Sequence, residues 1–102
     1  MIAVYATKRR DHYRLYVEGH AGSDGEGKLV CAAVSALTGA LLHFAKERAA
    51  CRHCRTSVEG GRAFLSCHGG LSNAFEMTVS ALAELAEAYP AHMKRPILSS
   101  DR

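Results

Sequence analysis

GHAGSDGEGKLVCAAVSAL, residues 19–37, is the stretch that joins the first strand-like segments of the chain to its first long apolar segment. We interpret it as the end of a strand, a glycine-rich loop and the beginning of a helix. His20 stands where the strand ends, and Cys31 stands where the helix is expected to begin. A loop that folds back on itself would bring these two side chains together.

A thiol at the beginning of a helix has the surroundings of a nucleophile. The amides of a first helical turn have no partners within the helix and carry a partial positive charge, so they favour a thiolate. A neighbouring imidazole can accept the thiol proton and orient the sulfur. The structural alternative is that Cys31 is a small buried residue of an alanine-rich helix and His20 an exposed residue at a strand end. The spacing alone leaves both interpretations open.

The chain has 102 residues and a formal net charge of +3, which suits a single domain over residues 1–102. A core of this size is modest, so dimerisation would add stability. The weak positive charge does not demand a nucleic-acid partner, and we expect no direct nucleic-acid binding.

The amino-terminal residues show no targeting signal. Met1 leads directly into apolar residues without a basic segment, so we expect no signal peptide, and no stretch is expected to approach a membrane span. We therefore expect a cytoplasmic protein that does not bind membranes and whose four cysteines are reduced.

Alternating apolar residues, and apolar residues spaced by three and four, predict four strands and two helices. Each of two hairpins precedes an amphipathic helix, which gives the order ββαββα. Two helices on one face of a four-stranded, mainly antiparallel sheet make a two-layer α+β domain. The predicted strands are residues 2–7, 13–18, 52–59 and 62–67, and the predicted helices run from about Leu29 to Ala50 and from Ser72, the candidate N-cap, to about Tyr89.

The remaining segments have no regular pattern. Ser23–Gly27 is interpreted either as a mobile lid or as a plain connector. The polar tail from His92 to Arg102 is expected to fray, apart from Ile97 and Leu98. Three histidines without convergent partners in the sequence are interpreted as surface residues: His12, His43 and His92.

The second hairpin contains residues that could bind a metal. Zinc takes ligands of the kind supplied by Cys51, Cys54, Cys67 and His68. However, a two-residue turn at Gly60-Gly61 would place Cys54 opposite Cys67 on the core face, with Thr56 opposite Leu65 and Val58 opposite Ala63. His68 would then point to the other face, so free thiols are favoured over a zinc site.

The loop and the first helix resemble a known protein family. Glu18-Gly19-His20-Ala21-Gly22, followed by Gly27 and by Val30-Cys31-Ala32-Ala33-Val34-Ser35-Ala36-Leu37, is similar to the signature of the ribosomal-processing cysteine proteases called Prp. The second hairpin and Ala88-Tyr89-Pro90 at the end of the second helix also resemble that family. The resemblance covers nearly the whole chain.

The resemblance implies a small bacterial homodimer that removes the N-terminal extension of a large-subunit ribosomal protein, the twenty-seventh type. The motif cysteine of the family is the nucleophile and the motif histidine is its base, so these roles fall on Cys31 and His20. The resemblance implies neither a metal nor an organic cofactor. The other motif positions, expected to form the loop and the substrate site, are Gly19, Ala21, Gly22, Gly27 and Ser35.

The chain departs from the family pattern at one place. The family usually has a glycine, a variable residue and an aspartate before the apolar pair and the cysteine, whereas Gly27-Lys28 leads directly into Leu29-Val30-Cys31. Asp24 or Glu26 would have to replace that aspartate. The alternative function is therefore a diverged, non-catalytic ribosome-associated or protein-binding module of the same fold.

Overall fold

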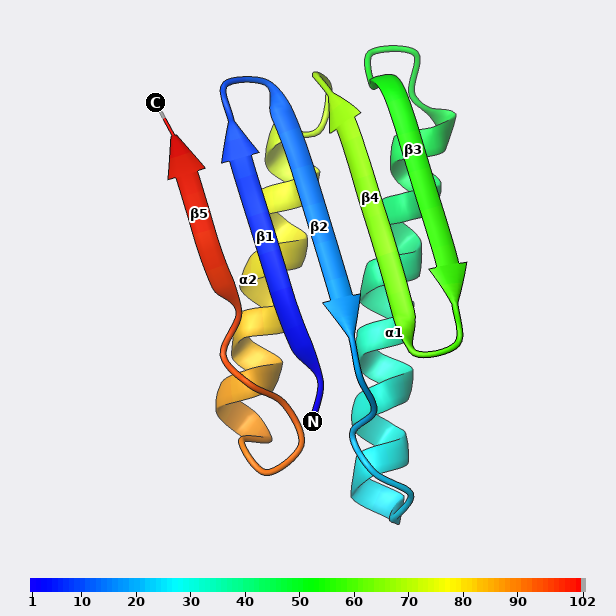
Figure 1. Cartoon of the computed structure of the whole chain (residues 1–102), viewed down its shortest axis with the longest axis vertical. Helices are drawn as coiled ribbons and strands as arrows, with labels where there is room; N and C mark the ends of the chain where they lie inside the picture. Colours follow the sequence, from blue (N-terminus) through cyan, green and yellow to red (C-terminus); the bar gives the residue numbers. More distant parts are fainter. Residues whose placement is uncertain (102) are drawn as a thin grey trace.

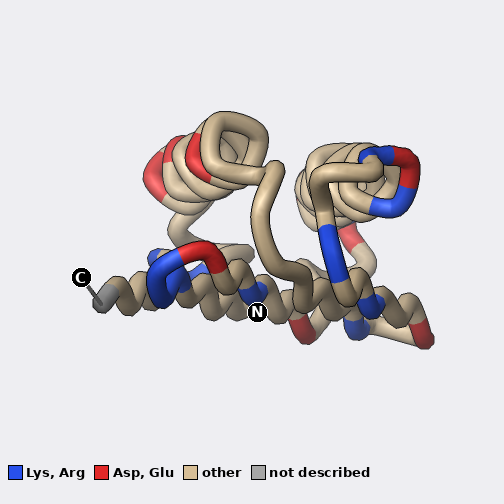
Figure 2. The backbone as a smooth tube through the Cα atoms, turned by 90° about the horizontal axis from the view of Figure 1, so that it is seen from above, with Lys and Arg blue, Asp and Glu red and all other residues tan. Residues whose placement is uncertain are grey.

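Five strands and two helices form the computed structural model, which describes residues 1–101 (Figure 1). Both helices lie on the same face of the sheet (Figure 2), so the predicted two-layer α+β class is confirmed. The strands are β1 (Ala3–Arg9), β2 (His12–Glu18), β3 (Arg52–Glu59), β4 (Arg62–His68) and β5 (Ile97–Asp101), and the helices are α1 (Gly25–Glu47) and α2 (Ser72–Ala88).

The sheet has the order β3-β4-β2-β1-β5 and contains one strand more than the sequence predicts. β5 pairs parallel to β1, whereas all other neighbouring strands are antiparallel. The expectation of a frayed tail, from which Ile97 and Leu98 were excepted, was therefore wrong for residues 99–101, and Arg102 lies outside the described residues. Ile97 and Leu98 are 60% and 61% exposed, so backbone pairing rather than apolar burial holds β5, and its sequence carries no strand pattern.

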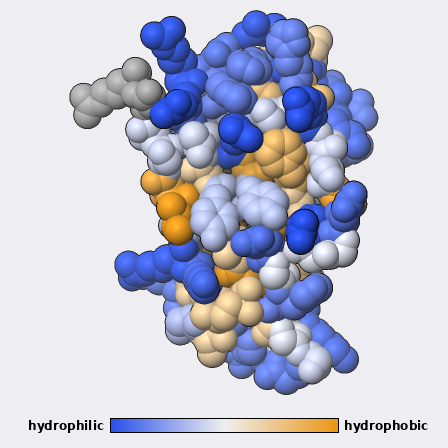
Figure 3. Space-filling model, viewed as in Figure 1, coloured by the Kyte–Doolittle hydropathy of each residue, from blue (hydrophilic) through white to orange (hydrophobic). Residues whose placement is uncertain are grey.

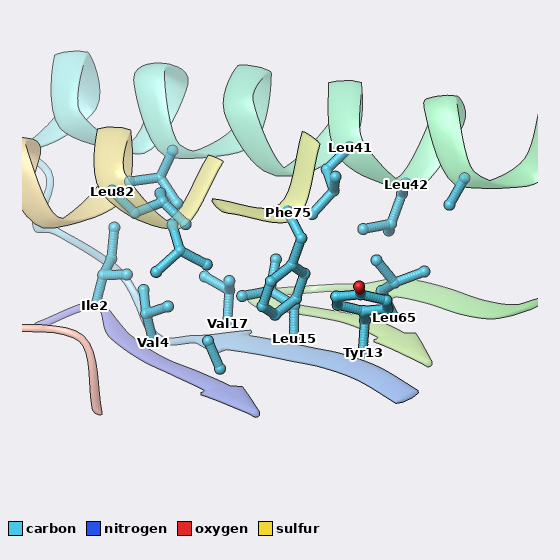
Figure 4. Packing of buried hydrophobic residues seen from close by; sticks show 14 of the residues in the cluster. Ile2, Val4, Tyr13, Leu15, Val17, Leu41, Leu42, Leu65, Phe75 and Leu82 are labelled. Atoms are coloured by element: carbon cyan, nitrogen blue, oxygen red, sulfur yellow. The ribbon is translucent and has the colours of Figure 1, made fainter. Parts of the chain in front are cut away.

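The core lies between the sheet and the two helices. Alternate residues of β1 and β2 point toward the helices. Leu15 of β2 and Leu65 of β4 are fully buried in this core. Figure 4 shows these strand residues packed against Leu41 and Leu42 of α1 and Phe75 and Leu82 of α2. The opposite face of the sheet carries no helix, and most of the side chains seen on it are hydrophilic (Figure 3).

Helix α1 begins and ends a few residues earlier than predicted. The Oδ1 atom of Asp24, its N-cap, accepts a hydrogen bond of 2.6 Å from the Gly27 amide. This cap compensates for the low helix propensity of two glycines in the first turn. Residues 25–27 are therefore helical, and the loop that we interpreted as a lid or connector retains only Ser23 and Asp24.

Helix α1 is long and apolar enough to cross a membrane by length and composition alone. The expectation that no stretch of the sequence is long and apolar enough to span a membrane was therefore wrong. A core helix of a soluble protein passes the same test, and α1 buries Val30, Val34, Leu41 and Leu42 in the core of this domain.

The β3–β4 hairpin has the predicted register near its turn. Thr56 pairs with Leu65 and Val58 with Ala63, but a bulge between Arg52 and Arg55 prevents the predicted pairing of Cys54 with Cys67. Val58 is 73% exposed, so its assignment to the core was wrong; β3 is an edge strand, and Val58 borders a surface cavity.

Helix α2 begins and ends close to the predicted residues. Its N-cap is Leu71 rather than Ser72, and no side chain caps it. The helix ends at Ala88, two positions before Pro90, which cannot continue a helix.

Candidate active site

His20 and Cys31 line one surface cavity of about 240 Å³. The cavity lies where the end of β2, the first half of α1 and the β3–β4 turn meet. Gly19 and Ser35, two other residues expected at the site, also line it, whereas Ala21, Gly22 and Gly27 lie outside its lining. The structure thus brings together the thiol, the imidazole and one face of α1.

Backbone hydrogen bonds hold the loop that carries His20. The Met1 amino group donates to the His20 carbonyl at 2.7 Å, and the Gly19 amide donates to the Gly61 carbonyl at 2.9 Å. Gly19 has a φ of +103°, and a Cβ atom there would lie 2.2 Å from the Met1 carbonyl oxygen. Only glycine fits this position, which explains the glycine before His20.

Cys31 lies in the second turn of α1, not in its first turn as the sequence suggested. The amides of Gly27 and Lys28 already donate to the side chain and the carbonyl of Asp24, so the free helix N-terminus is not what faces the thiol. The Ala21 amide of the loop donates to Cys31 Sγ instead, at 3.3 Å. The partial positive charge beside the sulfur therefore comes from a loop amide, and not from the first turn of the helix as expected.

The imidazole of His20 is exposed and lies against the hairpin turn. A Cβ atom built on Gly61 would be 2.7 Å from His20 Nε2 and 3.1 Å from Cε1. Among the hydrogen bonds of residues 1–101, none joins this imidazole to the Cys31 thiol. Catalytic hydrogen bonds often form fully only when substrate binds, so the absence of this bond in the free protein is compatible with a base role for His20.

The two acidic residues considered as replacements for the family aspartate have different surroundings. Asp24 is used as the N-cap of α1. Glu26 Oε1 lies 3.7 Å from His92 Nε2, and His92 Nδ1 lies 2.5 Å from the Ala21 carbonyl oxygen. The interpretation of His92 as a surface residue without partners was wrong. The sequence offered no signal for it, because 71 positions separate His92 from Ala21.

Two hydroxyl-bearing residues of α1, Ser35 and Thr38, also line the cavity. Ser35 is exposed and follows Cys31 by one helical turn. Thr38 is only 4% exposed, and its hydroxyl oxygen has no hydrogen-bond partner among the described residues. Thr38 was not among the residues expected at the site, although its spacing from Cys31 and Ser35 places it on the same face of the helix.

The remaining cysteines form a separate group on the core side of the sheet. Burial raises the pKa of the Cys67 thiol to about 12, with Cys51 and Cys54 beside it adding to the shift. His68 lies on the other face, where its ring stacks on His12 at 4.1 Å between ring centroids. Within residues 1–101, no group of three or more histidine, cysteine or acidic side chains is arranged to hold a metal ion.

The domain thus has a cysteine thiol and an imidazole in one cavity. These are the two groups that a thiol-dependent hydrolase needs. The family described as Cysteine protease Prp matches residues 1–94. The chain belongs to this family, as its loop and helix residues led us to expect.

Solved structures agree with the fold. A Streptococcus mutans protein is 22% identical, with a TM-score of 0.72 over 99% of this chain and 96% of that protein. The essential ribosomal processing protease Prp from S. aureus, in complex with a covalently linked product peptide, is 19% identical, with a TM-score of 0.72 over 99% and 100%. The same S. aureus protease with a substrate peptide is 17% identical, with a TM-score of 0.69 and the same coverage. No curated protein sequence matches the chain.

Proposed function

We propose that this protein is a cysteine endopeptidase in which Cys31 is the nucleophile and His20 the base. The observation that carries the proposal is the cavity that both side chains line, with the Ala21 amide on the sulfur. A donor directed at sulfur stabilises a thiolate more than a thiol, because hydrogen bonds to a charged acceptor are the stronger ones.

The reaction follows from these two groups. The His20 imidazole accepts the Cys31 proton, and the thiolate attacks the carbonyl carbon of the scissile peptide bond. The bond to nitrogen breaks as the imidazolium gives its proton to the leaving amine. Water, deprotonated by His20, then attacks the thioester and releases the acid, and the proton returns to the sulfur. The residues require no metal or organic cofactor for these steps.

The substrate proposed is the N-terminal extension of a large-subunit ribosomal protein. Membership of the Prp family supports this, as does the substrate peptide bound by the S. aureus ribosomal processing protease of the same fold. Such a substrate places the enzyme in the cytoplasm. We also propose a homodimer, which sedimentation at micromolar concentration would detect and a purely monomeric profile would refute.

The test is incubation of the purified protein with the ribosomal precursor of its own organism, followed by intact mass measurement. Loss of the extension is expected with the wild type and not with Cys31→Ala, which keeps the helix because alanine is a strong helix former. One observation favours the non-catalytic alternative: Gly27-Lys28 leads directly into Leu29-Val30-Cys31, without the aspartate that the family usually has before the apolar pair. An intact precursor bound by the protein would decide for that alternative.

A further inference from the structure

His92 lies on a segment that is tightly held, although it follows the last helix. The Ile2 amide donates to the His92 carbonyl at 3.0 Å, and the Lys94 amide donates to the Ile2 carbonyl at 2.9 Å. Between them, Met93 is 1% exposed in the core. The connection from α2 to β5 and the loop from β2 to α1 lie at the same end of the molecule (Figure 1). His92 therefore reaches the loop from a fixed backbone.

The imidazole of His92 joins the loop to the beginning of α1. Its side chain is 13% exposed. Nδ1 lies 2.5 Å from the Ala21 carbonyl oxygen, and since a carbonyl only accepts, Nδ1 must carry the proton. The other ring nitrogen, Nε2, lies 3.7 Å from the Oε1 atom of Glu26, whose side chain is 57% exposed.

Ala21 connects this imidazole to the thiol. Its carbonyl accepts from His92, and its amide donates to Cys31 Sγ at 3.3 Å. The preceding carbonyl, that of His20, accepts from the Met1 amino group at 2.7 Å. The Ala21 amide shares its planar peptide unit with the His20 carbonyl, which Met1 holds, and the Ala21 carbonyl belongs to the next unit, which His92 holds. The two bonds together fix the Ala21 backbone on both sides and keep its amide directed at the sulfur.

We propose that His92 is a positioning residue for the Cys31 thiol, which it orients through Ala21, and that Glu26 forms an ion pair with the second ring nitrogen when the ring carries both protons. This inference rests on the nucleophilic role proposed for Cys31. In this proposal the Glu26 carboxylate, in the first turn of α1, acts on the site through His92 and makes no direct contact with His20 or Cys31.

The test compares side chains that differ only in where they place a donor. His92→Ala removes the donor, His92→Asn places an amide where Nδ1 stands, and His92→Gln places it near Nε2 instead. Two quantities are measured: the rate at which iodoacetamide labels Cys31 near neutral pH, by peptide mass spectrometry, and the hydrogen exchange of the Ala21 amide. His43→Ala, an exposed change on α1, is the control.

We expect His92→Ala to slow the labelling of Cys31 by about tenfold, roughly the loss of one hydrogen bond to a charged group, and to speed exchange at Ala21. His92→Asn should restore both quantities, whereas His92→Gln should not. Glu26→Ala should have a smaller effect, because its carboxylate acts only through the imidazole, and the double variant should be no slower than His92→Ala alone.

Wild-type labelling in His92→Ala, equal rates in the Asn and Gln variants, or additive effects of Glu26→Ala and His92→Ala would each overturn the proposal. If His92→Ala does not fold, the comparison of Asn with Gln decides alone. Labelling needs no peptide substrate, so a protein that cleaves nothing but responds as expected refutes the proposed function and leaves this inference standing.

Discussion

At the scale of single residues, Gly61 determines where the His20 imidazole can lie. Gly61→Ala would place a methyl group 2.7 Å from Nε2 at a φ of +76°, so the ring must move away from the turn. Because a misplacement of about 1 Å can cost roughly 100-fold in rate, we expect cleavage of the ribosomal precursor to fall by about 10- to 100-fold. Initial rates followed by mass spectrometry measure this change.

The neighbouring glycine supplies the control for that substitution. A Cβ atom on Gly60 meets nothing within 4 Å, so Gly60→Ala should keep the wild-type rate. Equal rates in the two variants would show that the contact between Gly61 and His20 does not matter for catalysis.

Thr38 carries the one buried side-chain polar atom without a partner among the described residues. Thr38→Val removes the hydroxyl at nearly constant volume, so we expect the free energy of unfolding to rise by about 1 kcal/mol. Urea denaturation measures it. Thr78→Val is the matched control, because Thr78 is equally buried but its hydroxyl donates to the Ala74 carbonyl at 2.8 Å. Stabilisation by both substitutions, or by neither, would contradict the conclusion that the Thr38 hydroxyl is buried without a hydrogen-bond partner among residues 1–101.

At the scale of elements, the beginning of α1 depends on Asp24. We expect Asp24→Ala to lower the free energy of unfolding by about 1 kcal/mol, since it removes the acceptor of the Gly27 amide. Asp24→Ser keeps a capping oxygen without the charge and should retain both stability and cleavage. Thermal unfolding and the precursor assay test the pair. Loss of cleavage in a stable Asp24→Ser would instead make the carboxylate part of the reaction.

The open face of the sheet contains a histidine whose charge opposes folding. Burial lowers the pKa of His12 from 6.5, and the nearby charges of His68 and Arg14 lower it further. The unfolded chain therefore binds a proton more readily than the folded chain in this range. The free energy of unfolding should consequently fall as the pH drops below about 6.5, and His12→Gln should reduce that slope. Denaturation at several pH values checks this; an unchanged slope, as expected for His43→Gln, would contradict it.

The elements themselves show what the sequence could predict. Both helices and four strands follow apolar periodicity, so they were found within a few residues. The start of α1 was missed because two glycines argue against a helix, although Asp24 before them is a good N-cap. The glycine-rich loop between His20 and Cys31 suggested that these residues come together, and both line one cavity. His92 was missed because its contact with the loop depends on the long-range pairing of Met93 with Ile2, which no local pattern predicts.

At the scale of the whole molecule, β5 covers a sheet edge without contributing to the site. It lies beyond the residues that match the Prp family, and none of its residues lines the cavity of His20 and Cys31. Deletion from Ile97 onward removes strand pairing but little buried apolar surface. We expect the shortened protein to fold and to label Cys31 at the wild-type rate. The uncovered edge of β1 should increase self-association, because free strand edges pair with other chains. Sedimentation of both proteins measures this increase, and a change in the labelling of Cys31 would show that β5 supports the site after all.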